Sequence, residues 1–195
     1  MTATLERPTT TSDGFPFLTA PLPTARLKLR PFQITDAPRV AMFAGDFEVA
    51  RMTARIPHPY GERDARDFIA NAAIGKALAI VHANGVIGAV GLEAVDKSGA
   101  ELGYWLGRPF WGRGFVTEAA RVVIDASLQW CPTLTVTASH FEDNPASRRV
   151  LAKLGFMPTG ERMIRSIARN EDVRALTYRL SASATSQSPS RSRSP

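Results

Sequence analysis

The chain has 195 residues, a net charge of +6, 44% hydrophobic residues and 22% charged residues, values that are ordinary for a globular protein. This length fits one domain with tails. It contains no run of about 18 apolar residues, so no membrane-spanning helix is expected, and residues 1–24 lack the pattern of a signal peptide. A single cysteine, Cys131, excludes an internal disulfide. We therefore expect a cytoplasmic protein with no membrane partner.

The positive charge suits an anionic ligand such as a nucleotide or coenzyme A. Nucleic-acid binding requires a dense basic face with interleaved aromatic residues, and no such cluster is present, so no nucleic-acid partner is expected. His58, His82 and His140 lie far apart, without a HExxH pattern or paired cysteines, and we expect no metal site.

Both ends of the chain have the composition of unstructured segments. Residues 1–24 are rich in Thr and Pro, and residues 181–195 form a Ser/Arg/Pro tail of low complexity. The sequence therefore predicts a disordered N-terminal extension over 1–24, one domain over 25–180 and a disordered tail over 181–195.

The first half of this domain begins with a strand and two helices and continues with antiparallel strands. Alternating polar and apolar residues predict strands, apolar residues at helical spacing predict helices, and Asn84-Gly85 favours a tight hairpin turn. The expected elements are a strand over 26–30, a helix from Thr35 or Asp36 to Phe43, a helix over 62–73, and strands over 77–81, 86–90 and 99–106.

In the second half, helices and strands alternate. The pattern predicts a helix over 117–128, a strand over 134–138, a helix that begins at Asn144-Pro145 and stops at Gly155, and a last strand over 173–180. Antiparallel strands followed by alternating helices and strands indicate an α+β fold with a mixed, mostly antiparallel sheet.

The first motif with chemical meaning is the glycine-containing turn of residues 111–116, WGRGFV, between a strand and a helix. The first N–H groups of a helix have no partner within it, and the helix dipole adds positive potential there. Gly112 and Gly114 let the backbone turn and approach a ligand closely, and Arg113 adds charge. A pyrophosphate fits such an anion-binding turn. A third glycine for a dinucleotide fingerprint and a GxxxxGK pattern are both missing.

The second motif is residues 144–156, NPASRRVLAKLGF. Asn144 is a good N-cap and Pro145 a good first helical residue. Ser147 then lies at the third helical position, where the helix dipole favours developing negative charge. Read alone, Asn144 and Ser147 also fit a purely capping role.

The two motifs together, ELGYWLGRPFWGRGFVTEAA followed about thirty residues later by NPASRRVLAKLGF, resemble the GNAT superfamily of N-acetyltransferases, and within it the RimJ/RimL-like, ribosomal-protein N-acetyltransferase branch. The resemblance covers roughly residues 27–180. It implies the GNAT fold, with a central sheet of six to seven strands flanked by about four helices, and acetyl-CoA as cofactor.

The resemblance also implies roles for individual residues. The turn corresponds to the family's pyrophosphate loop, usually Gln or Arg, two residues, Gly, any residue, then Gly or Ala. Gly114 matches this pattern, whereas Trp111 and Val116 depart from it, and Val116 stands where a small Gly or Ala is usual. The residues implied to contact the cofactor are Tyr104, Trp105, Leu106, Trp111, Gly112, Arg113, Gly114, Phe115, Val116, Thr117, Asn144 and Ser147.

For catalysis, the resemblance implies that Ser147 protonates the departing thiolate and that Asn144 binds the pantetheine or a catalytic water. Glu101, on the strand before the turn, is the candidate base, with Glu93 acting through water as its rival. The Pro-bounded segment 52–60 is expected to border the acceptor pocket. The acceptor is a protein N-terminus or a small-molecule amine, and the sequence leaves open a monomer or homodimer. A catalytically silent CoA-binding regulatory or interaction module is the alternative.

Overall fold

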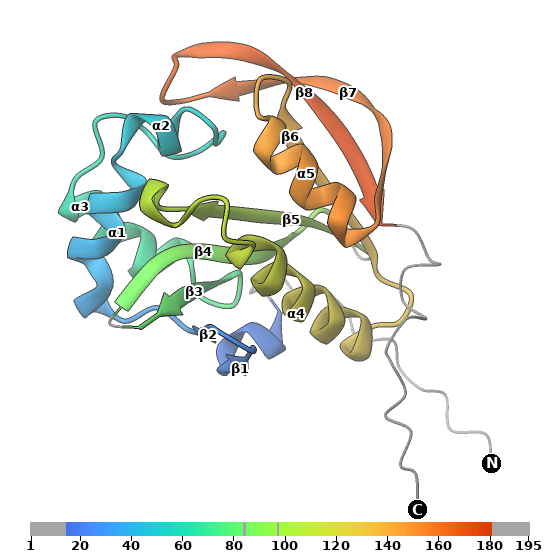
Figure 1. The fold of residues 1–195 in the computed structure, drawn as a ribbon, viewed down its shortest axis with the longest axis horizontal. Helices are drawn as coiled ribbons and strands as arrows, with labels where there is room; N and C mark the ends of the chain where they lie inside the picture. The colour runs from blue at the N-terminus through green and yellow to red at the C-terminus, as the bar shows by residue number, and fades with distance from the viewer. Residues whose placement is uncertain (1–14, 84, 97, 181–195) are drawn as a thin grey trace, which may run out of the picture.

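The computed structural model describes residues 15–83, 85–96 and 98–180, which form one mixed sheet with helices on both faces (Figure 1). The sheet has eight strands in the order β1-β2-β3-β4-β5-β6-β8-β7. The strands are β1 (Leu22–Pro23), β2 (Lys28–Arg30), β3 (Ala77–His82), β4 (Gly85–Ala94), β5 (Gly99–Leu106), β6 (Thr135–Phe141), β7 (Phe156–Ser166) and β8 (Glu171–Leu180). The α-helices are α1 (Ala37–Ala44), α2 (Phe47–Ala50), α3 (Glu62–Asp67), α4 (Phe115–Trp130) and α5 (Pro145–Leu154).

The predicted α+β fold with a mixed, mostly antiparallel sheet is confirmed, but the sheet has eight strands where six to seven were expected. The two-residue strand β1 and the long strand β7 account for the difference. α2, with four residues, was also not predicted, and the helix expected over 62–73 is α3 followed by a π-helical turn, Phe68–Ala72. The expected turn residue Asn84 lies outside the described residues. Within the described part of the chain, no helix combines the length and apolarity that crossing a membrane requires.

The extension expected to be unstructured up to residue 24 is in part a packed segment. Pro16–Thr19 form a 3₁₀ turn, and Phe15 and Leu18 are each only 1% exposed. Phe15 contacts Trp130 at the end of α4 in an edge-to-face arrangement, with ring centroids 5.7 Å apart. Residues 15–24 therefore belong to the folded domain. The expectations for residues 1–14 and 181–195 lie outside the described residues.

The two faces of the sheet carry different helices. Val90 and Tyr104 are opposite each other on β4 and β5, and their face packs in the core cluster that contains the buried residues of α4 and α5. Trp105, the next residue on β5, points to the other face and packs on the cluster formed with α1 and α3. Adjacent residues of a strand point to opposite faces, so β5 contributes to both sides of the molecule.

The fold departs from a continuous sheet between β5 and β6. These parallel strands pair only from Gly99 to Leu102 on β5, although β5 continues to Leu106 and β6 to Phe141. Gly107 donates its N–H to Ile87 of β4, so alternation along the ladder directs the backbone groups of Tyr104 and Leu106 away from β4. The strands therefore diverge and leave part of an inner sheet edge without a neighbouring strand.

The hairpin β7–β8 is tied at its turn to the segment that follows α2. Arg169 donates from Nε to the carbonyl of Arg51 at 2.7 Å and pairs with Asp143 at 2.9 Å, and its side chain is only 10% exposed. Ile167 donates its N–H to the carbonyl of Ala54 at 3.1 Å. These contacts hold the hairpin, at the top of Figure 1, against the loop that follows α2.

Candidate active site

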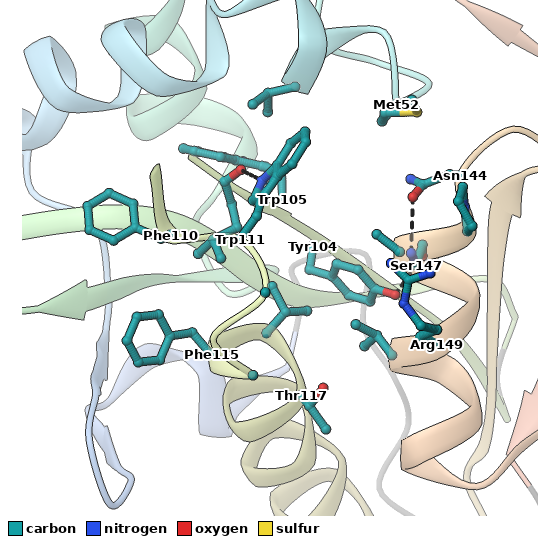
Figure 2. Close-up of a pocket in the computed structure, with 18 of the residues that line it drawn as sticks. Met52, Tyr104, Trp105, Phe110, Trp111, Phe115, Thr117, Asn144, Ser147 and Arg149 are labelled. Atoms are coloured by element: carbon teal, nitrogen blue, oxygen red, sulfur yellow. Dashed lines mark hydrogen bonds between the residues drawn. The ribbon is translucent and has the colours of Figure 1, made fainter. Parts of the chain in front are cut away.

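The turn before α4 has the backbone conformation that its glycines allow. Gly112 and Gly114 both have φ of +76°, in the left-handed region that most residues avoid. A Cβ atom at Gly112 would meet nothing within 4 Å, so conformation rather than space requires glycine there. The Trp111 indole N–H donates to the Leu106 carbonyl at 2.6 Å and holds the turn against the end of β5 (Figure 2).

The start of α4 has unpaired amides. Its N-cap residue, Gly114, offers no capping side chain, and the amides of residues 112–117 have no hydrogen-bond acceptor among the described residues. The acid in the first turn, Glu118, points away to the backbone N–H and guanidinium of Arg26 and the hydroxyl of Thr24. Burial opposes ionisation of Glu118, but these hydrogen bonds lower its pKa below the usual value. The helix start therefore retains the positive potential that attracts an anion.

A cleft of about 400 Å³ lies between this turn and α5. The predicted cofactor-contacting residues all line it, except Arg113, whose carbonyl accepts a hydrogen bond from Arg26 Nη1 at 3.1 Å. Of the predicted backbone contacts, the N–H and C=O groups of Tyr104 and Leu106 face the unpaired edge, whereas those of Trp105 face Ala89 of β4. The side chain of Val116 is partly buried against the core.

Two cations that sequence reasoning missed also line this cleft. Arg149 and Lys153 are exposed on α5 and form no ion pair with any described residue. They are four residues apart, so they lie on one side of the helix. That spacing within the second motif is the signal that identifies them.

The side chain of Asn144 caps the start of α5, as predicted. The Ser147 N–H donates to Asn144 Oδ1 at 3.0 Å, Pro145 is the first helical residue, and Gly155 ends the helix with φ of +85°. Ser147 is buried, and its Oγ lies 2.7 Å from the hydroxyl of Tyr104, which points across the cleft from β5 (Figure 2). Burial raises the pKa of Tyr104 to about 12. The family resemblance implied only a backbone role for Tyr104, so this hydroxyl contact was not predicted.

A second cleft, of about 920 Å³, opens on the α1/α3 face of the sheet. Residues 52–56 and Tyr60, from the segment expected to border the acceptor pocket, line it. The two clefts meet where β5 and β6 diverge. The residues that line both are Met52, Thr53, Tyr104, Trp105, Asn144 and Ser147.

The two candidate bases lie side by side in the second cleft. Glu93 and Glu101 are directly opposite each other on β4 and β5 and therefore share a face. Glu93 forms an ion pair with Arg55. Glu101 accepts a hydrogen bond from Ser139 Oγ at 2.6 Å and pairs with Arg162 of β7 at 2.8 Å. Arg162 was not identified from the sequence, because it lies on the strand that was not predicted.

Comparison with known proteins identifies the family. The model of the acetyltransferase (GNAT) domain matches residues 26–157. The chain belongs to the GNAT acetyltransferase family. An uncharacterised N-acetyltransferase, p20, of Bacillus licheniformis is 30% identical over 147 residues, which are 70% of this chain and 82% of p20.

Solved structures share the GNAT fold. A GNAT-family acetyltransferase from Bacillus anthracis matches with a TM-score of 0.74 and 21% identity, over 84% of this chain and 99% of that one. Mycobacterium smegmatis RimJ in complex with CoA-disulfide matches with a TM-score of 0.71 and 21% identity, over 89% and 93%. The predicted family is confirmed, and RimJ among the structural neighbours agrees with the predicted branch. The chain is thus an acetyltransferase, and acetyl-CoA is its cofactor.

Proposed function

We propose that this protein transfers an acetyl group from acetyl-CoA to a primary amine by direct attack of the amine on the thioester. The observation that carries this proposal is the meeting of two clefts, one from each face of the sheet, where β5 and β6 diverge. A donor in the first cleft and an acceptor in the second would meet beside Ser147 and Tyr104. Direct transfer requires this arrangement because both substrates must be present together.

The first cleft has groups that suit the pyrophosphate and the pantetheine of acetyl-CoA. The unpaired amides of residues 112–117 are suited to the pyrophosphate, with Arg149 and Lys153 adding positive charge beside it. The outward-facing backbone groups of Tyr104 and Leu106 are suited to the pantetheine, which would pair with β5 as a short extra strand. The Leu106 carbonyl already accepts from Trp111, so the Leu106 N–H and both Tyr104 groups remain for this pairing. Acetyl-CoA supplies an activated thioester when it is bound.

Ser147 is the proposed acid. It is buried at the third position of α5, lines both clefts and carries a proton that a departing thiolate can take. Asn144 Oδ1 caps the helix and holds the Ser147 backbone, while its amide nitrogen is available to the pantetheine or to a water. Main-chain N–H groups beside the thioester would stabilise the oxyanion of the tetrahedral intermediate.

Glu101 is the proposed base, acting directly or through water, with Glu93 as the alternative. Both carboxylates line the acceptor cleft, and their arginine partners hold them in place. If Glu101 is the base, Glu101→Gln lowers turnover across pH 6–9, and Glu93→Gln lowers it much less. Full activity of Glu101→Gln over this range would exclude Glu101 from the role.

A protein N-terminus is the preferred acceptor. The acceptor cleft is more than twice as large as the donor cleft and extends to β7, which gives room for residues that follow a terminal amine. The resemblance to the ribosomal-protein N-acetyltransferase branch supports the same class. The competing function, a CoA-binding module without turnover, is less favoured because Ser147 and Glu101 both face the clefts.

The decisive experiment measures release of free CoA thiol from acetyl-CoA with N-terminal peptides, amino acids, polyamines and aminoglycosides. We expect turnover with at least one primary amine, and most with peptides. Tight CoA binding with no turnover on any acceptor would support the silent module, and absence of CoA binding would contradict both functions.

A further inference from the structure

The hydroxyl pair formed by Tyr104 and Ser147 joins β5 to α5 at the junction of the two clefts. The two oxygens are 2.7 Å apart, and the residues are separated by 43 positions in the chain. Both residues line both clefts. The Ser147 N–H donates to Asn144, which fixes the backbone of Ser147 but not the direction in which its O–H points.

The environment determines which oxygen donates. Tyr104 has no other hydrogen-bond partner among the described residues, and burial keeps it neutral at pH 7–9 by raising its pKa to about 12. If Ser147 donated to Tyr104, the partly buried phenolic O–H would have no acceptor among the described residues, which is unfavourable. If Tyr104 donates to Ser147 Oγ, the phenolic O–H is paired, and the serine O–H, which has no other acceptor among the described residues, can point into the cleft.

We propose that Tyr104 is a positioning residue for acetyl transfer: its O–H donates to Ser147 Oγ and thereby directs the serine's own proton toward the sulfur that leaves. This inference rests on the proposed acid role of Ser147. Tyr104 keeps its proton throughout, and Ser147 regains the proton that it gives to the thiolate from water in the clefts, to which the proton lost by the amine is returned. It acts on the orientation of Ser147 and therefore on the step in which the C–S bond breaks, rather than on cofactor binding.

The test compares Tyr104→Phe, Ser147→Ala and the double variant in steady-state kinetics with the best acceptor from the panel. Tyr104→Phe keeps the ring and removes only the hydroxyl. We expect it to lower kcat about tenfold, with the KM for acetyl-CoA changed by less than about twofold, because misdirected catalytic groups lose rate rather than binding. In the Ser147→Ala background, Tyr104→Phe should lower kcat no further, because coupled groups act as one unit.

Tyr178→Phe is the matched control. Tyr178 is also buried, and its hydroxyl lies 3.1 Å from His140 Nε2 on β6. We expect it to lower thermal stability without the loss of kcat. Melting temperature and CoA affinity, measured for each variant, separate lost folding from lost positioning.

Three outcomes would contradict the inference. They are wild-type kcat in Tyr104→Phe, equal losses in kcat and CoA affinity, and additive losses in the double variant. Each can occur while the wild-type protein acetylates amines, so failure of the inference is distinct from failure of the proposed function. The latter would appear as no turnover by the wild-type chain with any acceptor.

Discussion

The two helices that border the donor cleft begin in opposite ways. α4 begins after Gly114 with no capping side chain and with amides that have no acceptor among the described residues, whereas α5 begins with the Asn144 side chain bound to the Ser147 N–H. An uncapped helix start leaves donors available for a ligand, and a capped one fixes the position of its own side chains. One cleft thus combines a site for an anion with a rigid support for a reactive hydroxyl.

The largest expected effect comes from the hydroxyl that the capped helix holds. Ser147→Ala should lower kcat about a hundredfold, or roughly 2.7 kcal/mol, while acetyl-CoA affinity changes little. Steady-state kinetics and calorimetric CoA binding measure the two quantities. Ser127→Ala, which removes another buried helical serine hydroxyl, is the control and should keep turnover. An equal loss in binding and turnover would support a capping role for Ser147 alone.

The next effect concerns the uncapped start. Gly114→Ala places a side chain at φ +76°, and we expect a loss of about 1 kcal/mol in unfolding free energy and about tenfold weaker CoA binding. Denaturant unfolding and CoA titration are the measurements. Gly61→Ala is the matched control, because φ there is −111° and the added atom meets only Asp64, at 3.7 Å. Unchanged CoA affinity in Gly114→Ala would argue against the amides of this turn as the anion site.

Asn144→Ala tests the capped start of α5. Removing the cap should lower the free energy of unfolding by about 1 kcal/mol. Asn144→Ser keeps a capping oxygen but lacks the amide, so it should retain stability. If its kcat also stays at the wild-type value, the amide nitrogen has no part in turnover, and capping is the whole role of Asn144.

The smallest effect is electrostatic. Burial opposes ionisation of Glu118, but hydrogen bonds from Thr24 and Arg26 lower its pKa in the fold, so these contacts contribute stability above the usual value of 4.5, and this contribution is lost as the pH falls through the folded-state value. Glu118→Gln should therefore be less stable than wild type at pH 7 by less than about 1 kcal/mol, and the difference should shrink at pH 3. Urea unfolding at the two pH values measures it. A stability difference between wild type and Glu118→Gln that is larger at pH 3 than at pH 7 would contradict the lowered pKa of Glu118.

Local signals made much of this arrangement predictable. Asn144, Pro145 and Gly155 mark the ends of α5 because capping depends on adjacent residues, and Gly112 and Gly114 locate the turn for the same reason. The pairing of Tyr104 with Ser147 and of Glu101 with Arg162 spans 43 and 61 positions. No local pattern encodes these contacts, because the tertiary fold brings the residues together.

Two misses have specific physical causes. β7 is exposed along nearly its whole length, so it lacks the alternation of buried and exposed residues that indicates a strand. Phe15 and Leu18 are anchors within a segment whose Thr and Pro content resembles a disordered tail. Composition averaged over 24 residues conceals two side chains that pack fully.

The divergence of β5 and β6 has a consequence for solubility. Open strand edges at the margin of a sheet are templates for aggregation. Here the unpaired stretch of β5 lies in the interior of the sheet, between β4 and the diverging β6, with α4 and α5 packed on the same face. The fold can therefore keep hydrogen-bonding groups open for a slender ligand chain while hindering their capture by a strand of another molecule.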